Sequence, residues 1–376
     1  MLKFLNGTIV LPERLLVGQL LVNETRIAEF GETVTGTGET VDLAGGYLVP
    51  GFVDLHVHGG GGADIMDGDE AAQTVAATHL RSGTTTLLAT TMTAPLTDLE
   101  QAFAGIARVS RRQDAAAAFI AGVHLEGPFI SAAKLGAQPD FTRAVTLDEV
   151  AALHAIAPIR VLTLAPEVAG QTSVIAALVA MGIRVQLGHS DASYEASIAA
   201  LDAGASGFTH LFNAMSGLHH RAPGMAGAAL AHAHHAEIIP DLLHVHPGAI
   251  RVALRSIAGL YCVTDSTAAA SMPDGDYRLG RQQVTRCMGG VRLADGTLAG
   301  SVLTMDQAFR NLVNVVGLDL AEASRHTSTI AADYLGLSDR GRLVAGAVAD
   351  VRGLPEGRCG CHGFCPGCGR LWLERD

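Results

Sequence analysis

Residues 50–89, the stretch that decides the fold, read PGFVDLHVHGGGGADIMDGDEAAQTVAATHLRSGTTTLLA. An apolar segment at 52–57 is followed by an Ala-rich helical segment at 70–82 and by a second apolar segment at 84–89. Short apolar strands that alternate with helical segments are typical of repeated βα units with a parallel sheet. We therefore expect an α/β fold from residue 50 onward.

The same alternation continues for more than 200 residues. Further strands are predicted at 118–125, 160–164, 184–187, 207–209, 236–239 and 260–264, and helices at 96–112, 171–181, 193–203, 247–257, 304–316 and 320–335. The helix at 304–316 opens with the capping-box pair Thr304 and Gln307 and is followed by Gly317. Eight strands predict a (β/α)8 TIM-like barrel over 50–336, although a doubly wound open sheet would share the alternation.

The two ends of the chain are expected to form a second domain. Residues 8–49 contain short apolar stretches separated by turns, and an apolar stretch that ends at Asp350 could return to the same sheet. A length of 376 residues fits a barrel of about 250 residues with an accessory domain. We predict a small β-sandwich from residues 1–49 plus 337–376, with an atypical C-terminal part that lacks a closing strand from Arg352 onward.

Four cysteines crowd into the last residues of the chain, at Cys359, Cys361, Cys365 and Cys368. Thiolates at this spacing can surround a tetrahedral zinc ion. The Gly, Arg, Cys and Pro bias of residues 352–376 equally resembles an out-of-frame translation or a disordered end. The protein sequence leaves these alternatives open, and reading the gene in all frames would separate them.

Composition and charge exclude several classes of partner. The chain has 37 acidic and 26 basic side chains and a formal net charge of -11, whereas nucleic-acid binding needs clustered Lys and Arg. No apolar run approaches the roughly 18 residues of a membrane span, and the N-terminus lacks a signal-peptide layout. We expect a cytoplasmic protein that binds neither nucleic acid nor membrane.

Residues suited to metal or proton chemistry follow five of the eight predicted strands. They are His56 and His58, His124 and Glu126, His189, His210, and Asp265. The carboxyl ends of barrel strands meet on one face, so residues far apart in sequence would share one pocket. The strand ends therefore predict an active site.

Each of these residues also has an ordinary structural interpretation. His56 and His58 are two apart on a strand and point to one side, as metal ligands or as a structural pair. Glu126 precedes a Gly-Pro turn, where a buried salt bridge is the alternative to metal binding. Asp265 could cap a helix or act as a general base. Taken together with His189 and His210, the set favours a metal-dependent hydrolase.

The motifs also resemble a known family. The run LVPGFVDLHVHG at 48–59 is similar to the opening strand of the amidohydrolase superfamily. HLEGP at 124–128, GHS at 188–190, THLFNAM at 209–215 and VTDST at 263–267 together resemble N-acetylglucosamine-6-phosphate deacetylases. Each motif is weak alone, but their order and spacing are specific. The resemblance covers roughly residues 5 to 350.

The resemblance implies the fold, the metal ligands and the assembly. It implies a barrel with a small β-sandwich and a homodimer whose active sites are shared between subunits. Glu126, His189 and His210 would bind a divalent cation, zinc or iron, with Asp265 as general acid/base. His56 and His58 match members that keep both histidines and would hold a second ion, so one or two ions per subunit are expected.

The resemblance also implies the substrate contacts, which are Ala137, Gln138, Asn213, Ala214, Arg221, His244, Leu298, Ala299 and Gly300. Arg221 and His244 would hold a 6-phosphate, one of them from the partner subunit. Gln138 stands where many relatives carry a histidine, which puts that sugar contact in doubt.

The expected reaction is hydrolysis of the acetamide of N-acetylglucosamine 6-phosphate to glucosamine 6-phosphate and acetate. The alternatives are deacetylation of N-acetylgalactosamine 6-phosphate or another N-acyl substrate, and a catalytically silent scaffold.

Overall fold

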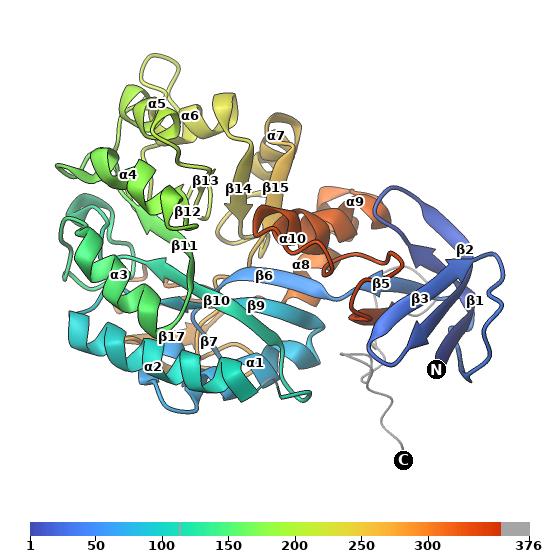
Figure 1. Cartoon of the computed structure of the whole chain (residues 1–376). Helices are drawn as coiled ribbons and strands as arrows, with labels where there is room; N and C mark the ends of the chain where they lie inside the picture. Colours follow the sequence, from blue (N-terminus) through green and yellow to red (C-terminus); the bar gives the residue numbers. More distant parts are fainter. Residues whose placement is uncertain (113, 355–376) are drawn as a thin grey trace.

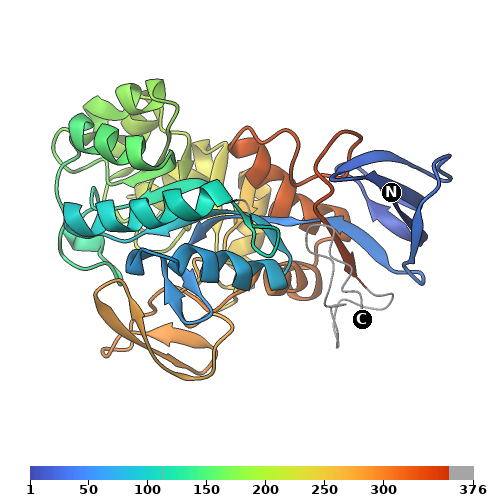
Figure 2. The same cartoon turned by 60° about the horizontal axis from the view of Figure 1, so that its bottom comes forward.

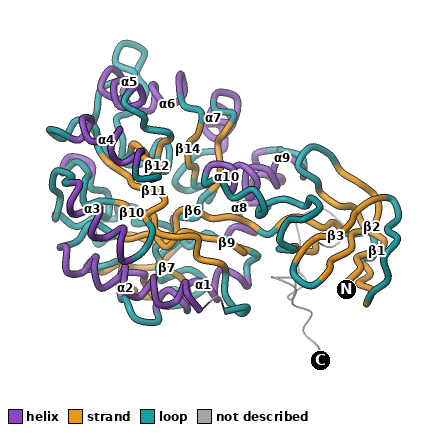
Figure 3. The backbone as a smooth tube through the Cα atoms, in the orientation of Figure 1, coloured by secondary structure: helices purple, strands orange, loops and turns teal. Residues whose placement is uncertain are grey.

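The computed structural model describes residues 1–112 and 114–354. Eight strands with the predicted order and spacing form the central barrel, with the helices outside them (Figures 1 and 3). These strands are β6 (Phe52–Val57), β9 (Thr84–Thr91), β10 (Phe119–Glu126), β11 (Ile159–Leu164), β12 (Arg184–Leu187), β13 (Gly207–Phe208), β14 (His235–Ile238) and β15 (Gly259–Cys262).

Hydrogen bonds between neighbouring strands close the barrel. Six strands follow the parallel order β13-β12-β11-β10-β9-β6, and β14 pairs with β15 in parallel. The Leu211 amide donates to the Glu237 carbonyl at 2.9 Å, after β13 and within β14. The Asp265 amide donates to the His56 carbonyl at 2.9 Å and joins the end of β15 to β6. The architecture is a TIM-like barrel, and the open sheet is excluded.

The helices that cover the barrel bury one face each. They are α1 (Ala71–Arg81), α2 (Leu96–Arg112), α3 (Leu147–Ile156), α4 (Gln171–Ala180), α5 (Tyr194–Asp202), α6 (Gly224–His232), α7 (Pro247–Ser256) and α8 (Met305–Asn311). Helix α2 buries Leu99, Phe103 and Ile106, whose spacing of three and four places them on one stripe. Strands β6 and β9 are buried along their whole length, as in other parallel sheets.

A six-stranded sheet lies beside the barrel, at the right of Figure 1. It has the order β19-β5-β1-β2-β3, with β4 paired to β1, and packs its own apolar cluster. Its strands are β1 (Leu2–Val10), β2 (Leu15–Asn23), β3 (Arg26–Gly31), β4 (Glu39–Asp42), β5 (Tyr47–Pro50) and β19 (Val351–Leu354). The expected loss of the strand is wrong for residues 351–354, because these pair antiparallel with β5 through their backbones. The cysteine-rich tail lies outside the described residues.

Several elements escaped the sequence analysis. Helices α3 and α6 were not predicted, nor was the three-stranded sheet of β16 (Gly275–Leu279), β17 (Gln282–Cys287) and β18 (Gly290–Arg292), which lies far from the terminal sheet (Figure 2). Short elements also occur in loops: β7 (Gly59–Gly60), β8 (Ala63–Asp64), η1 (Ile65–Asp67) and η2 (Ala132–Lys134).

The last two predicted helices are interrupted. Helix α8 runs into a π-helical turn, η3 (Leu312–Val316), and the following segment divides into α9 (Leu320–Ser324), a π-helical turn η4 (Arg325–Thr329) and α10 (Ile330–Tyr334). Thr304 is the N-cap of α8, but the predicted capping box is wrong. The Thr304 hydroxyl donates to Asp306, and the Gln307 amide donates to Asn311 at 2.7 Å. Gly317 ends η3 in a left-handed conformation, as predicted.

None of the helices in the described residues has both the length and the apolar character that a membrane span requires.

Candidate active site

The six predicted metal and acid/base residues lie together at the carboxyl ends of the barrel strands. They are His56 and His58 at the end of β6, Glu126 at the end of β10, His189 after β12, His210 after β13, and Asp265 after β15. All six side chains are buried. Convergence of strand ends thus brings residues 209 positions apart into contact.

Glu126, His189 and His210 form the first group of metal-binding side chains. The Glu126 Oε1 atom lies 3.1 Å from His189 Nε2 and 3.0 Å from His210 Nε2, and the two Nε2 atoms are 3.0 Å apart. The Nδ1 of His189 donates to the Lys134 carbonyl at 2.8 Å, so its Nε2 presents a lone pair to the group. Three convergent donor atoms of these types fit a divalent cation.

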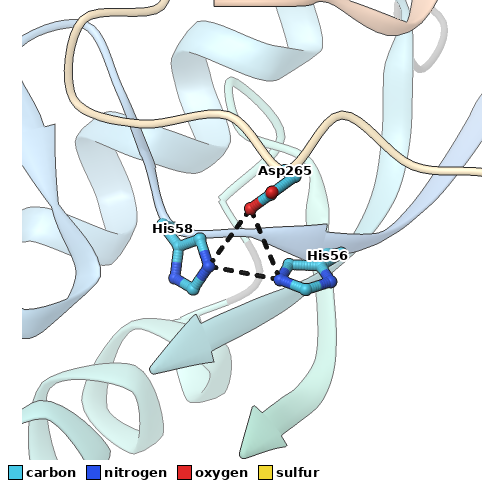
Figure 4. A group of neighbouring side chains, drawn as sticks. All are labelled: His56, His58 and Asp265. Carbon is cyan, nitrogen blue, oxygen red and sulfur yellow. Dashed lines mark hydrogen bonds and ion pairs between the residues drawn. The ribbon is translucent and has the colours of Figure 1, made fainter. Parts of the chain in front are cut away.

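His56, His58 and Asp265 form the second group (Figure 4). The two histidine Nε2 atoms are 3.2 Å apart, and the Asp265 Oδ1 lies 3.5 Å from that of His56 and 3.3 Å from that of His58. The Glu126 Oε2 atom lies 3.4 Å and 3.1 Å from the same two nitrogens. Glu126 therefore turns one oxygen to each group, and the second group also fits a cation.

The charges of the two groups are strongly coupled. Burial would raise the pKa of Glu126, but the neighbouring His56 and His189 lower it well below its usual range. Burial would lower the pKa of His58, but Asp265 and Glu126 raise it to about 9. Burial opposes ionisation of Asp265, yet both histidines of the second group lower its pKa. The carboxylates are ionised, and a cation would compete with protons for the imidazoles.

Three of the site residues adopt left-handed backbone conformations. The φ angles are 47° at His189, 29° at His210 and 50° at Asp265. Such conformations cost about 1–3 kcal/mol each in residues other than glycine and persist where the surroundings hold them. The fold thus maintains strained backbone at three positions that aim side chains into the centre.

A pocket of about 250 Å³ opens above the two groups. Seven of the nine expected substrate contacts line it, namely Ala137, Gln138, Asn213, Ala214, His244, Leu298 and Gly300. The sequence analysis missed four further lining residues, Met92, Gly136, Leu279 and Thr297. Leu279 comes from the three-stranded sheet, so that sheet forms part of the pocket wall.

The side-chain amide of Gln138 is hydrogen-bonded to Glu126. The Thr93 backbone amide donates to Gln138 Oε1 at 2.7 Å, which fixes the orientation of the side chain. Gln138 Nε2 then donates to Glu126 Oε2 at 2.7 Å. One of its two amide hydrogens is therefore engaged with a carboxylate that faces both groups, and only the other can reach a substrate hydroxyl.

The expected phosphate contacts occupy different places. His244 Nδ1 donates to Asp241 Oδ2 at 2.7 Å, and although burial opposes protonation, Asp241 raises the pKa of His244. His244 therefore lies at the pocket wall beside a carboxylate that favours its protonated form. Arg221 is exposed, contacts His220, and does not line the pocket of a single chain. Ala299 is fully buried behind the wall.

The sequence analysis also missed Glu237, a fully buried carboxylate on β14. It lies 2.9 Å from the Nδ1 of His56. An acidic residue inside a predicted apolar strand at 236–239 was the signal that could have revealed it.

Comparison with known proteins is consistent with this site. The model of the Amidohydrolase family matches residues 47–351. The N-acetylglucosamine-6-phosphate deacetylase of Lysinibacillus sphaericus is 37% identical over 344 residues, 88% of this chain and 87% of the relative. The N-acetylgalactosamine-6-phosphate deacetylase of Escherichia coli O157:H7 is 39% identical over 317 residues, 82% and 84% of the two chains.

Solved structures agree over the whole fold. An N-acetylglucosamine-6-phosphate deacetylase from Pasteurella multocida superposes with a TM-score of 0.89 at 32% identity, covering 95% of this chain and 96% of the other. A mutant N-acetyl-D-glucosamine-6-phosphate deacetylase from Mycobacterium smegmatis, in complex with N-acetyl-D-glucosamine-6-phosphate, gives 0.88 at 35% identity, covering 94% and 95%.

Proposed function

The chain belongs to the amidohydrolase family, and from that premise we propose that it hydrolyses the acetamide of N-acetylglucosamine 6-phosphate to glucosamine 6-phosphate and acetate. The observation that carries the proposal is a pocket whose floor holds Glu126, His189, His210 and Asp265. Its wall holds His244, whose protonated form the neighbouring Asp241 favours. A neutral N-acetyl group would meet the floor, and an anionic phosphate would meet the wall.

Glu126, His189 and His210 would hold the principal divalent cation, and His56, His58 and Asp265 would hold a second. The donor set suits zinc or iron, with one or two ions per subunit. When bound, such an ion lowers the pKa of water and polarises a carbonyl.

Asp265 is the proposed acid/base. Its pKa is lowered, so the carboxylate is ionised at neutral pH and can accept the proton of the attacking water. The same carboxylate returns that proton to the nitrogen as the C–N bond breaks, and the amine leaves neutral. Asn213 and Gly300, which line the pocket on either side, would position the sugar.

A homodimer would complete the phosphate site. Arg221 follows the exposed Leu218, which is 60% accessible in the single chain, and both lie on a surface loop before α6. We propose that the partner subunit's Arg221 reaches the phosphate beside His244, because its guanidinium offers a bidentate fork to phosphate. Arg221→Ala should raise the KM for the phosphosugar, and sedimentation should find a dimer.

The domain division is part of the proposal. Residues 1–49 and the described part of 337–376, up to residue 354, would form a small β-sandwich beside a barrel at 50–336, and the pairing of β19 with β5 supports it. A cytoplasmic location is also proposed, and cell fractionation would test it.

The decisive experiment replaces Asp265 by Asn in the metal-loaded enzyme and measures acetate release and metal content. We expect turnover to fall about 10²–10⁴-fold, the usual contribution of a general base, while the principal cation remains bound. Unchanged turnover would contradict the role of Asp265. A wild-type enzyme that binds metal but releases no acetate would instead support the silent scaffold.

A substrate panel separates the phosphosugars. We expect faster acetate release from N-acetylglucosamine 6-phosphate than from N-acetylgalactosamine 6-phosphate or unphosphorylated N-acetylglucosamine. Equal rates with and without phosphate would remove the argument from His244.

A further inference from the structure

Glu237 contacts both groups described above, and with His56 and His124 it forms a third buried set of side chains that could hold a metal ion. Its Oε2 atom lies 2.9 Å from the Nδ1 of His56 and accepts the backbone amide of His210 at 3.2 Å. Its side chain is completely buried, and the residue lies in β14. One carboxylate oxygen thus contacts a member of each group.

We propose that Glu237 is a positioning residue that orients His56 and His210 for cation binding; the proposal rests on the proposed metal-dependent function. A carboxylate at Nδ1 holds the proton there, so the lone pair of His56 is on Nε2. That Nε2 faces Glu126 and Asp265. A carboxylate behind a metal-binding histidine fixes its tautomer and ring orientation and increases its basicity.

The position of Glu237 is itself fixed by a chain of buried hydrogen bonds. Its Oε1 accepts the Tyr261 hydroxyl at 3.4 Å, and Gln186 Nε2 donates to that hydroxyl at 2.6 Å. Gln186 Oε1 accepts the Thr209 hydroxyl at 2.8 Å. Thr209 directly precedes His210 in sequence, so the chain of bonds returns to the centre. This support reduces the freedom of Glu237 to follow a displaced ligand.

The alternative is that Glu237 serves only stability, as the buried partner of His56. Both roles predict that its replacement weakens the fold, because breaking a buried ion pair leaves an uncompensated group. Only positioning predicts a loss of metal affinity that exceeds the loss caused by an equally buried defect nearby. Metal affinity is therefore the readout that separates the two roles.

The test compares Glu237→Gln with Tyr261→Phe in the full-length zinc-loaded enzyme. Zinc affinity is measured by competition with a chelator, and stability by thermal unfolding. Glu237→Gln keeps the size of the side chain but removes its charge, and we expect zinc affinity to fall about 10–100-fold. Tyr261→Phe removes a buried hydroxyl that contacts Glu237 but no metal ligand, and we expect a smaller loss of zinc affinity than in Glu237→Gln, because the charged contact to His56 remains.

Wild-type zinc affinity in Glu237→Gln would overturn the proposal, as would an equal loss in both variants. If Glu237→Gln does not fold, zinc affinity is measured in Glu237→Asp instead. It keeps the charge but is one methylene shorter, so it cannot hold His56 and the His210 amide together. Reduced zinc affinity would support positioning, and wild-type affinity would refute it.

Because zinc binding is measured without substrate, failure of the deacetylase proposal would show separately, as a wild-type enzyme that binds zinc and releases no acetate.

Discussion

Gly300 offers a sharp test of how the backbone positions Asp265. It lines the pocket with a φ of 62°, and a Cβ atom built there would lie 2.9 Å from the Asp265 carbonyl oxygen and 2.7 Å from a methyl of Thr267. Ordinary contacts begin at 3.4 Å, so Gly300→Ala must move the Asp265 backbone by about 0.5 Å. The carbonyl belongs to the backbone and cannot rotate away.

The expected effect on catalysis follows from that displacement. A misplacement of 1 Å can cost about 10²-fold in rate, so a shift of half that size should lower kcat on the order of 10-fold. An alanine with positive φ also costs about 1–2 kcal/mol of stability, whatever its surroundings. The variant Gly296→Ala measures this loss of stability alone, because the φ of Gly296 is 89° and nothing lies within 4 Å of a Cβ built there.

Both variants are compared by acetate release from N-acetylglucosamine 6-phosphate and by denaturant unfolding. We expect Gly296→Ala to lose stability while keeping wild-type kcat, and Gly300→Ala to lose both. A Gly300→Ala enzyme with wild-type kcat would refute the reasoning, since it would mean that the loop absorbs the clash without moving Asp265. A Gly296→Ala enzyme with the same loss of kcat would show that loop strain, not contact, is responsible.

Two further predictions concern the pocket wall and the support of Glu126. His244→Gln should raise the KM for the phosphorylated sugar about 10-fold, the value of a charged hydrogen bond, and leave the unphosphorylated sugar unaffected. Because Asp241 raises the pKa of His244, the wild-type KM should be low below that raised pKa and rise as the pH climbs through it. A KM independent of pH would count against a protonated His244. Gln138→Leu removes the donor to Glu126 and should lower kcat about 10–100-fold, so wild-type kcat in this variant would exclude an orienting role.

The strands and helices with a regular apolar pattern could be predicted from the sequence, because each is buried either on one face or completely. Strand 52–57 and helix 96–112 were predicted at their observed bounds, since a largely apolar run after the Pro50-Gly51 turn and an amphipathic stripe are clear signals. The sheet at 275–292 was missed because it alternates exposed and half-buried residues, with little apolar contrast between its faces. Strand β19 was missed because its pairing with β5 depends on backbone hydrogen bonds, which Arg352 and Gly353 make as well as β-branched residues do.

Most residues of the site could be predicted from the sequence, but their relative positions could not. Histidines and carboxylates after successive strands of a barrel must converge, so Glu126, His189 and His210 followed from topology alone. The place of Arg221 did not follow from topology, because Arg221 lies outside the pocket of a single chain and would contribute only from a second chain. Glu237 did not, because it lies inside strand β14 rather than after the end of a strand.

The number of cations depends on side-chain orientation rather than on motif. Glu126 turns Oε1 toward His189 and His210, and Oε2 toward the second group, where it also accepts the Gln138 amide. A carboxylate rotated away from this orientation would leave His56 and His58 with Asp265 alone. The amide of Gln138 opposes that rotation, because its own oxygen is fixed by the Thr93 backbone. The Gln138 contact therefore helps to keep Glu126 Oε2 on the second group, and Gln138 lies outside the short motifs.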